Sequence, residues 1–123
     1  MATVIVVDDD ASIRRALGSL LEILGFHALV FQSAEELLVS KLLVDNACLL
    51  LDVYLPGMSG IELCQSLAAS GHHLPTILMS GRDDEATRQI MRQVQPIACL
   101  LKPFDDKTLL KAIRKALRNL RNS

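Results

Sequence analysis

Short apolar runs alternate with segments of helical periodicity along the chain. The runs are rich in valine, isoleucine and leucine, which is typical of strands buried on both faces of a parallel sheet. They cover residues 4–7, 28–31, 48–51, 76–79 and 97–101. Because each run is followed by a segment of helical character, the sequence predicts five strands that alternate with five helices.

The first three helices are indicated by apolar spacing and by residues that favour helix ends. Apolar side chains recur every three or four positions over residues 13–24, and Gly25 supplies a C-terminal stop. Ser33 begins a Ser-x-x-Glu capping box that opens the second helix, which is expected to carry Leu42. Ser59 begins another such box, which predicts the start of the third helix.

Two further helices complete the predicted order of elements. The fourth is polar and expected over residues 85–93, and the fifth is expected to be capped by Asp105 or Asp106. Strands that alternate with helices form a parallel sheet with right-handed crossovers and helices on both faces. We therefore expect an α/β fold with a doubly wound five-stranded sheet. One domain should cover residues 1–120, with the start of a linker or C-terminal tail at residues 121–123.

Composition narrows the class of protein. Apolar residues make up 50% and charged residues 22% of the 123, and the net charge of −1 favours neither nucleic acid nor an anionic membrane as a partner. No apolar run approaches the length of a membrane span, and no signal stretch is present. Cys48, Cys64 and Cys99 lack metal-ligand spacing, so we expect reduced thiols buried in the core. These features predict a soluble, cytoplasmic protein.

Residues that can carry chemistry follow four of the five predicted strands directly. In a doubly wound sheet these strand ends meet at one edge, where ligands bind. Several carboxylates with no histidine or cysteine beside them suit a hard cation such as Mg²⁺, and a carboxylate next to Mg²⁺ can accept a phosphoryl group. The residues are Asp8, Asp9 and Asp10 after the first strand, Asp52 after the third, Ser80 after the fourth and Lys102 after the fifth.

The motifs at these strand ends resemble those of the receiver domain of two-component response regulators. The resemblance rests on VVDDD, on DVYLPGMSG at Asp52, on MSG at Ser80 and on KPF at Lys102. Asp52 lies 43 residues after Asp9, and Lys102 lies 22 residues after Ser80, which match the family's spacing. The resemblance covers nearly the whole chain and implies a flavodoxin-like fold with strand order 2-1-3-4-5. MSGRDD and KPFDD look most like receivers attached to helix-turn-helix transcription regulators.

The resemblance implies a role for the acidic residues. Asp52 would accept a phosphoryl group from a sensor histidine kinase, in a reaction that depends on Mg²⁺. Asp8, Asp9 and Asp52 would hold the ion together with the backbone carbonyl of Tyr54. Asp10, one position beyond the acidic pair, is expected to start the first helix.

It also implies roles for the residues that follow the last two strands. Ser80 and Lys102 would bind the phosphoryl oxygens, and the bond between Lys102 and Pro103 would be cis. Phosphorylation would switch the surface of the fourth helix and fifth strand, and so control dimerisation or an output domain. The chain is then a signalling domain, without turnover as an enzyme and without direct binding of nucleic acid.

Three features set this chain apart from the common receiver pattern. Cys99 stands where receivers usually carry a tyrosine or phenylalanine whose rotamer reports on phosphorylation, so Ser80 is left as the switch position without an aromatic partner there. Residues 94–96 replace an alanine and a glycine, so the loop after the fourth helix should differ in shape. Tyr54 and Arg82 occupy the two positions that tune dephosphorylation, and we expect their bulk to screen the attacking water.

Two other functions are compatible with parts of the pattern. A phosphatase of the haloacid dehalogenase type would use Asp8 as nucleophile and Asp10 as its second aspartate. That interpretation lacks the expected threonine, leaves no room for a cap domain and gives Asp52 no task. A pseudo-receiver that binds a partner without phosphorylation would explain Cys99, but the acidic pair, acceptor and lysine are all present.

Overall fold

The computed structural model describes residues 2–40 and 46–121, which contain five strands alternating with five helices, as predicted. The strands are β1 (Thr3–Val7), β2 (His27–Phe31), β3 (Ala47–Asp52), β4 (Thr76–Ser80) and β5 (Ala98–Leu101). The helices are α1 (Ala11–Ile23), α2 (Ala34–Ser40), α3 (Gly60–Ala69), α4 (Glu85–Val94) and α5 (Asp106–Arg121). The expected helical position Leu42 and the last two residues of the tail expected at residues 121–123 lie outside the described residues, while Arg121 is the last residue of α5.

The strands form one parallel sheet in the order β2-β1-β3-β4-β5, which confirms the predicted topology. β1 lies between β2 and β3, with Val6 opposite both Val30 and Leu50. The chain therefore reverses its direction of winding next to β1. In such a sheet the crevice outside the strand ends at this reversal is the usual ligand site.

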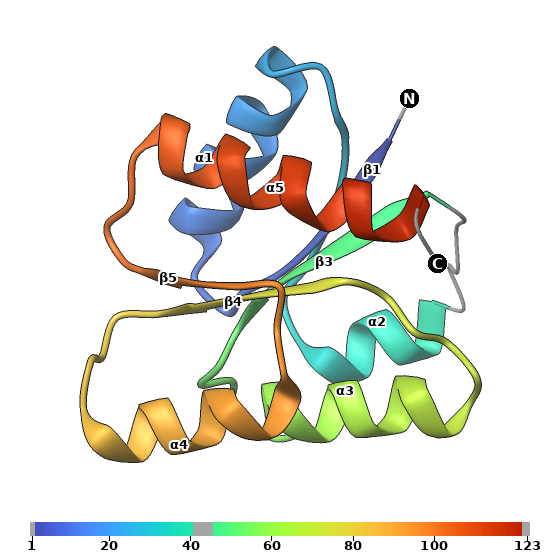
Figure 1. Cartoon of the computed structure of the whole chain (residues 1–123), viewed down its shortest axis with the longest axis vertical. Helices are drawn as coiled ribbons and strands as arrows, with labels where there is room; N and C mark the ends of the chain where they lie inside the picture. The colour runs from blue at the N-terminus through green and yellow to red at the C-terminus, as the bar shows by residue number, and fades with distance from the viewer. Residues whose placement is uncertain (1, 41–45, 122–123) are drawn as a thin grey trace.

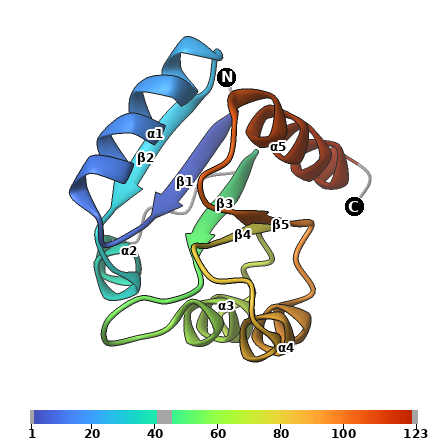
Figure 2. The same ribbon diagram turned by 90° about the vertical axis from the view of Figure 1, so that its left-hand side faces the viewer.

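Helices cover both faces of the sheet (Figures 1 and 2). α1 and α5 pack on one face, and α2, α3 and α4 pack on the other. Alternate residues of β1 enter different cores: Val4 and Val6 pack with α1 and α5, whereas Ile5 and Val7 pack with α2 and α3. Burial on both faces explains why the strand is continuously apolar instead of alternating apolar and polar residues.

Helix ends follow the predicted capping residues. Asp10 caps α1, where its carboxylate accepts hydrogen bonds from the backbone amides of Ser12 and Ile13. Ser59 forms the full capping box of α3, and the Ser33 hydroxyl accepts one from the amide of Glu36 at the start of α2. Of the two candidates for α5, Asp105 is the cap, since its carboxylate accepts a hydrogen bond from the Thr108 amide. Gln95 caps the C-terminal end of α4, and its backbone is left-handed (φ 54°) directly before Pro96.

The prediction of three buried thiols is wrong for Cys99. Cys48 is fully buried and Cys64 is half-buried, but Cys99 is exposed. β5 is an edge strand, and on the side of α4 a hollow of about 450 Å³ remains between helix and strand. Its lining includes Met91, Cys99 and Leu101, the last of them 51% exposed. The small side chain of Cys99 leaves this space unfilled.

No helix among the described residues is both long and apolar enough to cross a membrane.

Candidate functional site

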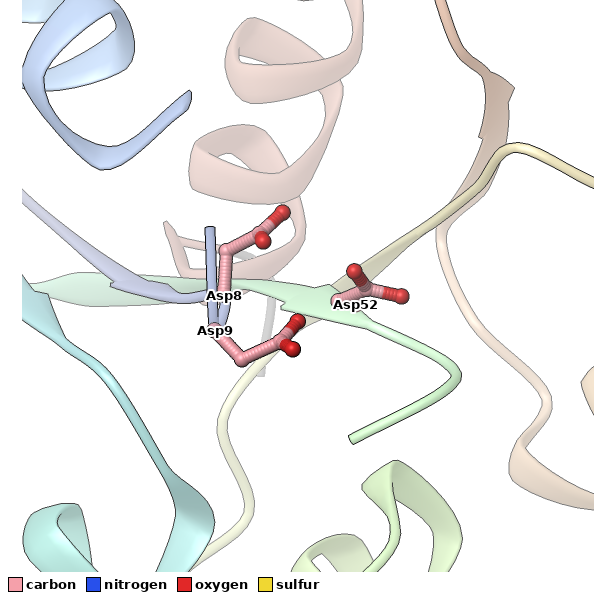
Figure 3. A group of neighbouring side chains, drawn as sticks. All are labelled: Asp8, Asp9 and Asp52. Carbon is pink, nitrogen blue, oxygen red and sulfur yellow. The ribbon is translucent and has the colours of Figure 1, made fainter. Parts of the chain in front are cut away.

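Three carboxylates meet at the carboxyl edge of the sheet. Asp8 and Asp9 follow β1 directly, and Asp52 is the last residue of β3, the neighbouring strand (Figure 3). One oxygen from each carboxylate lies within 4.8 Å of the other two. Asp8 and Asp52 are buried, whereas Asp9 is exposed. The strand register thus brings together the acidic residues that the sequence singled out.

The Asp8 side chain is held by the backbone that follows it. Asp8 is fully buried, and its Oδ1 accepts a hydrogen bond of 2.9 Å from the amide of Asp10. Arg14, on the first turn of α1, donates from Nη1 to the Asp8 carbonyl at 2.8 Å. These contacts leave the Oδ2 atom of Asp8 directed toward the end of β5.

Lys102 bridges two of the three carboxylates. Its ammonium lies 2.7 Å from Asp8 Oδ2 and 2.9 Å from Asp52 Oδ2. Burial alone would lower the pKa of Lys102, but hydrogen bonds to both aspartates outweigh it and raise the pKa above its usual value. The ammonium therefore stays charged at neutral pH. The peptide bond from Lys102 to Pro103 is cis, the isomer that the resemblance implied.

Asp52 lies in a confined position. Its Oδ1 accepts a hydrogen bond of 3.0 Å from the amide of Tyr54, and Oδ2 faces Lys102. Burial raises the pKa of Asp52, and the charge of Asp8 acts in the same direction; hydrogen bonds from Lys102 and Tyr54 partly offset both effects. Gly60 leaves room for this packing, since a Cβ atom there would lie 2.9 Å from the Asp52 carbonyl oxygen.

The donor set fits a divalent cation. Three carboxylates meet a single ammonium, so two negative charges remain without a partner charge in this group. Oxygen ligands from carboxylates are those that Mg²⁺ prefers, and Mg²⁺ commonly uses one or two of them with water and phosphate oxygens. The acidic cluster that repels itself in isolation is thus suited to bind a metal ion.

The hydroxyl of Ser80 reaches the same edge but is bonded elsewhere. Ser80 ends β4 and is fully buried. Its Oγ accepts a hydrogen bond of 2.9 Å from the Arg82 amide and donates one of 3.1 Å to the Arg82 carbonyl. In this structure Ser80 is therefore joined to its own turn, while Asp8, Asp52 and Lys102 are joined to one another.

Tyr54 and Arg82 belong to a second group of side chains, which we call the Tyr54 cluster: Tyr54, Arg82, Asp84 and Thr87. The Arg82 guanidinium carbon lies 4.7 Å from the centre of the Tyr54 ring. The Tyr54 hydroxyl lies 2.6 Å from Thr87 Oγ1, on the first turn of α4. Asp84, which caps α4, is hydrogen-bonded to both Arg82 and Thr87.

Sequence reasoning missed Asp84 and Thr87. Their only signal was an aspartate followed by a threonine three residues later, directly before a predicted helix. That pattern indicates a helix cap, which Asp84 is. It gives no indication that the capping pair also contacts Tyr54 from the loop after β3.

Comparison with known proteins agrees with this geometry. The chain matches the family described as "Response regulator receiver domain" over residues 4–114. It is 36% identical to the transcriptional regulatory protein FixJ of Azorhizobium caulinodans, over 91% of this chain and 53% of that protein. It is 38% identical to the nodulation protein W of Bradyrhizobium diazoefficiens, over 91% of this chain and 49% of that protein. The chain therefore spans about half the length of these curated relatives.

Solved structures show the same relationship. The crystal structure of FixJ-N superposes with a TM-score of 0.87 at 31% identity, covering 96% of this chain and 94% of that one. The response regulator StyR superposes with a TM-score of 0.89 at 36% identity, covering 98% of this chain and 61% of that one. The family match over residues 4–114 is to receivers, the family that the sequence motifs resemble. This chain belongs to the response regulator receiver domain family and is a signalling domain similar to the receivers of FixJ proteins.

Proposed function

We propose that this domain is a phosphorylation-controlled switch in which Asp52 accepts a phosphoryl group from a sensor histidine kinase. The observation that carries the proposal is the position of the Asp52 carboxylate, which lies 2.9 Å from the Lys102 ammonium and within 4.8 Å of carboxylate oxygens of Asp8 and Asp9. Asp52 ends its strand within a group that can bind cations and phosphoryl oxygens. Family membership supports the same function.

In the proposed reaction an Asp52 carboxylate oxygen forms a bond to phosphorus. The bond from phosphorus to the donor histidine nitrogen breaks, and its electron pair leaves with that nitrogen. Asp8, Asp9 and Asp52, together with the Tyr54 carbonyl, would hold Mg²⁺, which neutralises negative charge on the transferred group. Lys102 supplies a positive charge to a phosphoryl oxygen, which requires its ammonium to exchange a carboxylate partner for that oxygen.

Ser80 would supply a hydroxyl donor to the phosphoryl group. To do so its hydroxyl must leave the Arg82 carbonyl, to which it donates in the present structure. Movement of Ser80 would then alter the turn between β4 and α4. We propose that the surface of α4 and β5 is switched in this way and controls dimerisation or an output region.

Tyr54 and Arg82 are proposed to set the lifetime of the aspartyl phosphate. Arg82 stacks on the Tyr54 ring, so two bulky groups are held two residues beyond the acceptor and two beyond Ser80. If they screen the attacking water, the phosphoryl half-life should fall in Tyr54→Ala and Arg82→Ala. An unchanged half-life in both variants would contradict this role.

The process that the switch controls is inferred from the relatives of this chain. Several are described as transcriptional regulatory proteins, and the matched region covers only 53% and 58% of two of them. We propose that the domain controls transcription through a region that binds DNA, and that it works in the cytoplasm. The receiver itself, with a net charge of −1, has no excess of positive charge for nucleic acid.

Intact mass after incubation with acetyl phosphate and Mg²⁺ tests the proposal. The natural sequence should gain one phosphoryl group, and the gain should require Mg²⁺ and be lost in Asp52→Asn. Asp10→Asn, which changes an exposed capping residue beside the cluster, is the matched control and should still be modified. If neither acetyl phosphate nor a histidine kinase modifies the protein, it is a pseudo-receiver and the proposal is wrong.

A further inference from the structure

The donors and acceptors in the Tyr54 cluster have a fixed order, from the Tyr54 hydroxyl through the Thr87 hydroxyl to the Asp84 carboxylate. Asp84 is ionised at neutral pH, because hydrogen bonds from Thr87 and Arg82 hold its pKa well below the usual range. A carboxylate can only accept, so the Thr87 hydroxyl donates its single proton to Asp84 Oδ1. The Tyr54 hydroxyl must then be the donor in its 2.6 Å contact with Thr87 Oγ1.

Asp84 is the anchor of this cluster. Its Oδ1 accepts from the Thr87 amide at 2.8 Å and from the Thr87 hydroxyl at 2.5 Å. Its Oδ2 accepts from Arg82 Nη2 at 2.7 Å and Nε at 3.1 Å. Arg82, fixed in this way, lies over the Tyr54 ring. The loop after the acceptor and the first turn of α4 are thus joined by side chains of fixed orientation.

The same cluster is joined to Ser80 through the Arg82 backbone. The Ser80 hydroxyl is bonded to both the amide and the carbonyl of Arg82. It has one proton, so it cannot donate to a phosphoryl oxygen and to the Arg82 carbonyl at once. Binding of Ser80 to a phosphoryl group therefore releases the Arg82 carbonyl, one of the two backbone contacts that Ser80 makes with the residue whose guanidinium lies on Tyr54.

We propose that Thr87 is a positioning residue of this switch, which couples the state of Ser80 to the first turn of α4 through Tyr54. This inference rests on the proposed phosphorylation of Asp52. In the unphosphorylated domain Thr87 holds the Tyr54 hydroxyl, and release of Arg82 on phosphorylation loosens that contact. The change at Ser80 is then transmitted to α4 by Tyr54, which lies on the loop that follows the acceptor Asp52. Cys99, which is small and exposed, has no aromatic ring that could transmit the change in its place.

A purely structural role for Thr87 makes a different prediction. Thr87 is 1% exposed, and its amide is already capped by Asp84. If it only capped and filled the start of α4, loss of its hydroxyl would change stability but not the response of Tyr54 to phosphorylation. Tyr54 lies outside α4, on the loop after β3. The change at Tyr54 on phosphorylation therefore distinguishes a positioning role of Thr87 from a purely structural one.

The chain has one tyrosine and no tryptophan, so intrinsic fluorescence reports on Tyr54 alone. Tyrosine emission depends on the hydrogen bond of the hydroxyl and on charges next to the ring. Emission and intact mass would be followed together during phosphorylation by acetyl phosphate, with Mg²⁺ alone as the baseline. Thr87→Val removes the hydroxyl at nearly constant shape, and Thr87→Ser keeps a hydroxyl. Thr76→Val is the matched control, since it removes a threonine hydroxyl at the other end of β4.

We expect emission of the natural sequence to change in proportion to the phosphoryl adduct. Thr87→Val should form the adduct yet lose most of that change, and Thr87→Ser and Thr76→Val should retain it. If Thr87→Val loses its native circular dichroism, Thr87→Ala, which also removes the hydroxyl that contacts Tyr54, replaces it with the same expectation.

An emission change that is absent in the natural sequence, or of full size in Thr87→Val, would overturn the inference. A natural sequence that forms no adduct would show instead that the proposed function has failed, and the inference with it.

Discussion

Lys102 and Asp52, which are 50 residues apart in the chain, lie 2.9 Å apart between ammonium nitrogen and carboxylate oxygen. The same ammonium lies 2.7 Å from Asp8. One cation thus holds together the ends of β1, β3 and β5. A phosphoryl oxygen would compete with the two carboxylates for this ammonium, whereas a metal ion would compete with the ammonium for the carboxylates.

Loss of Lys102 should therefore destabilise the metal-free protein. In Lys102→Met the buried Asp8 carboxylate loses its cation, and we expect the free energy of unfolding to fall by roughly 1–3 kcal/mol. Urea unfolding in EDTA measures the change. Lys111→Met, an exposed lysine on α5, is the control and should change stability by less than about 0.5 kcal/mol.

Magnesium should reverse part of this loss, because the variant has one more carboxylate charge without a partner. The same unfolding experiment with Mg²⁺ should show a larger gain for Lys102→Met than for the natural sequence. Equal gains would contradict a shared site for the ion and the ammonium.

Asp84 should give the start of α4 a dependence on pH in the acid range. Its folded pKa is lowered below the ordinary value of 3.8, first by the Thr87 hydroxyl and amide and then by Arg82. A carboxyl whose folded pKa is depressed contributes stability above its unfolded pKa, and loses it as the pH falls through the folded pKa. The contribution should therefore be constant at neutral pH and disappear only below pH 3.8.

Titration of side-chain carboxyl carbons by nuclear magnetic resonance tests this shift. Asp84 should titrate below 3.8 in the natural sequence, and its pKa should rise in Thr87→Val and in Arg82→Gln. A pKa at or above the ordinary value would mean that the cluster does not form in solution.

The three thiols should differ in reactivity. Cys99 is exposed, Cys64 is half-buried and Cys48 is fully buried, where burial raises its pKa to about 12. Because the thiolate is the reactive form, iodoacetamide at mildly alkaline pH should modify Cys99 first and Cys48 only after unfolding. Peptide mass spectrometry over time gives the order. Native-state labelling of Cys48 as fast as Cys99 would contradict the fold at β3 and β5.

The same substitution at two glycines should have opposite effects. Gly60→Ala places a Cβ 2.9 Å from the Asp52 carbonyl oxygen, a backbone atom that cannot move freely, so a loss of roughly 1–3 kcal/mol is expected. Gly18→Ala lies inside α1, where the nearest atom, on Val30, is 3.7 Å away, and should stabilise by up to about 1 kcal/mol. Thermal unfolding compares them. Equal changes would show that the end of β3 is not closely packed against α3.

The site could be predicted because its residues follow strands. In a parallel doubly wound sheet the carboxyl ends lie at one edge, so Asp8, Asp52 and Lys102 had to converge once the strands were recognised. Capping patterns likewise placed the starts of α1 and α3 at Asp10 and Ser59. These features depend on the order of elements along the chain, which periodicity reveals.

Other features depend on how elements pack and on side-chain rotamers. The bonds of Ser80 to Arg82, and of Tyr54 to Thr87, depend on the angle at which α4 leaves β4. The exposure of Cys99 depends on how far α4 lies from an edge strand. Apolar neighbours in the sequence indicated a buried thiol, because they do not distinguish a central strand from an edge strand.

The position of the phosphoryl group is the most direct test of the proposed function. Borohydride reduces an acyl phosphate to an alcohol, so it converts the phosphorylated aspartate to homoserine, which peptide mass spectrometry can locate. After treatment with acetyl phosphate and Mg²⁺, we expect homoserine at position 52 only. Homoserine at position 8 or 9, or at no aspartate in a sample that carries the phosphoryl mass, would contradict Asp52 as the acceptor.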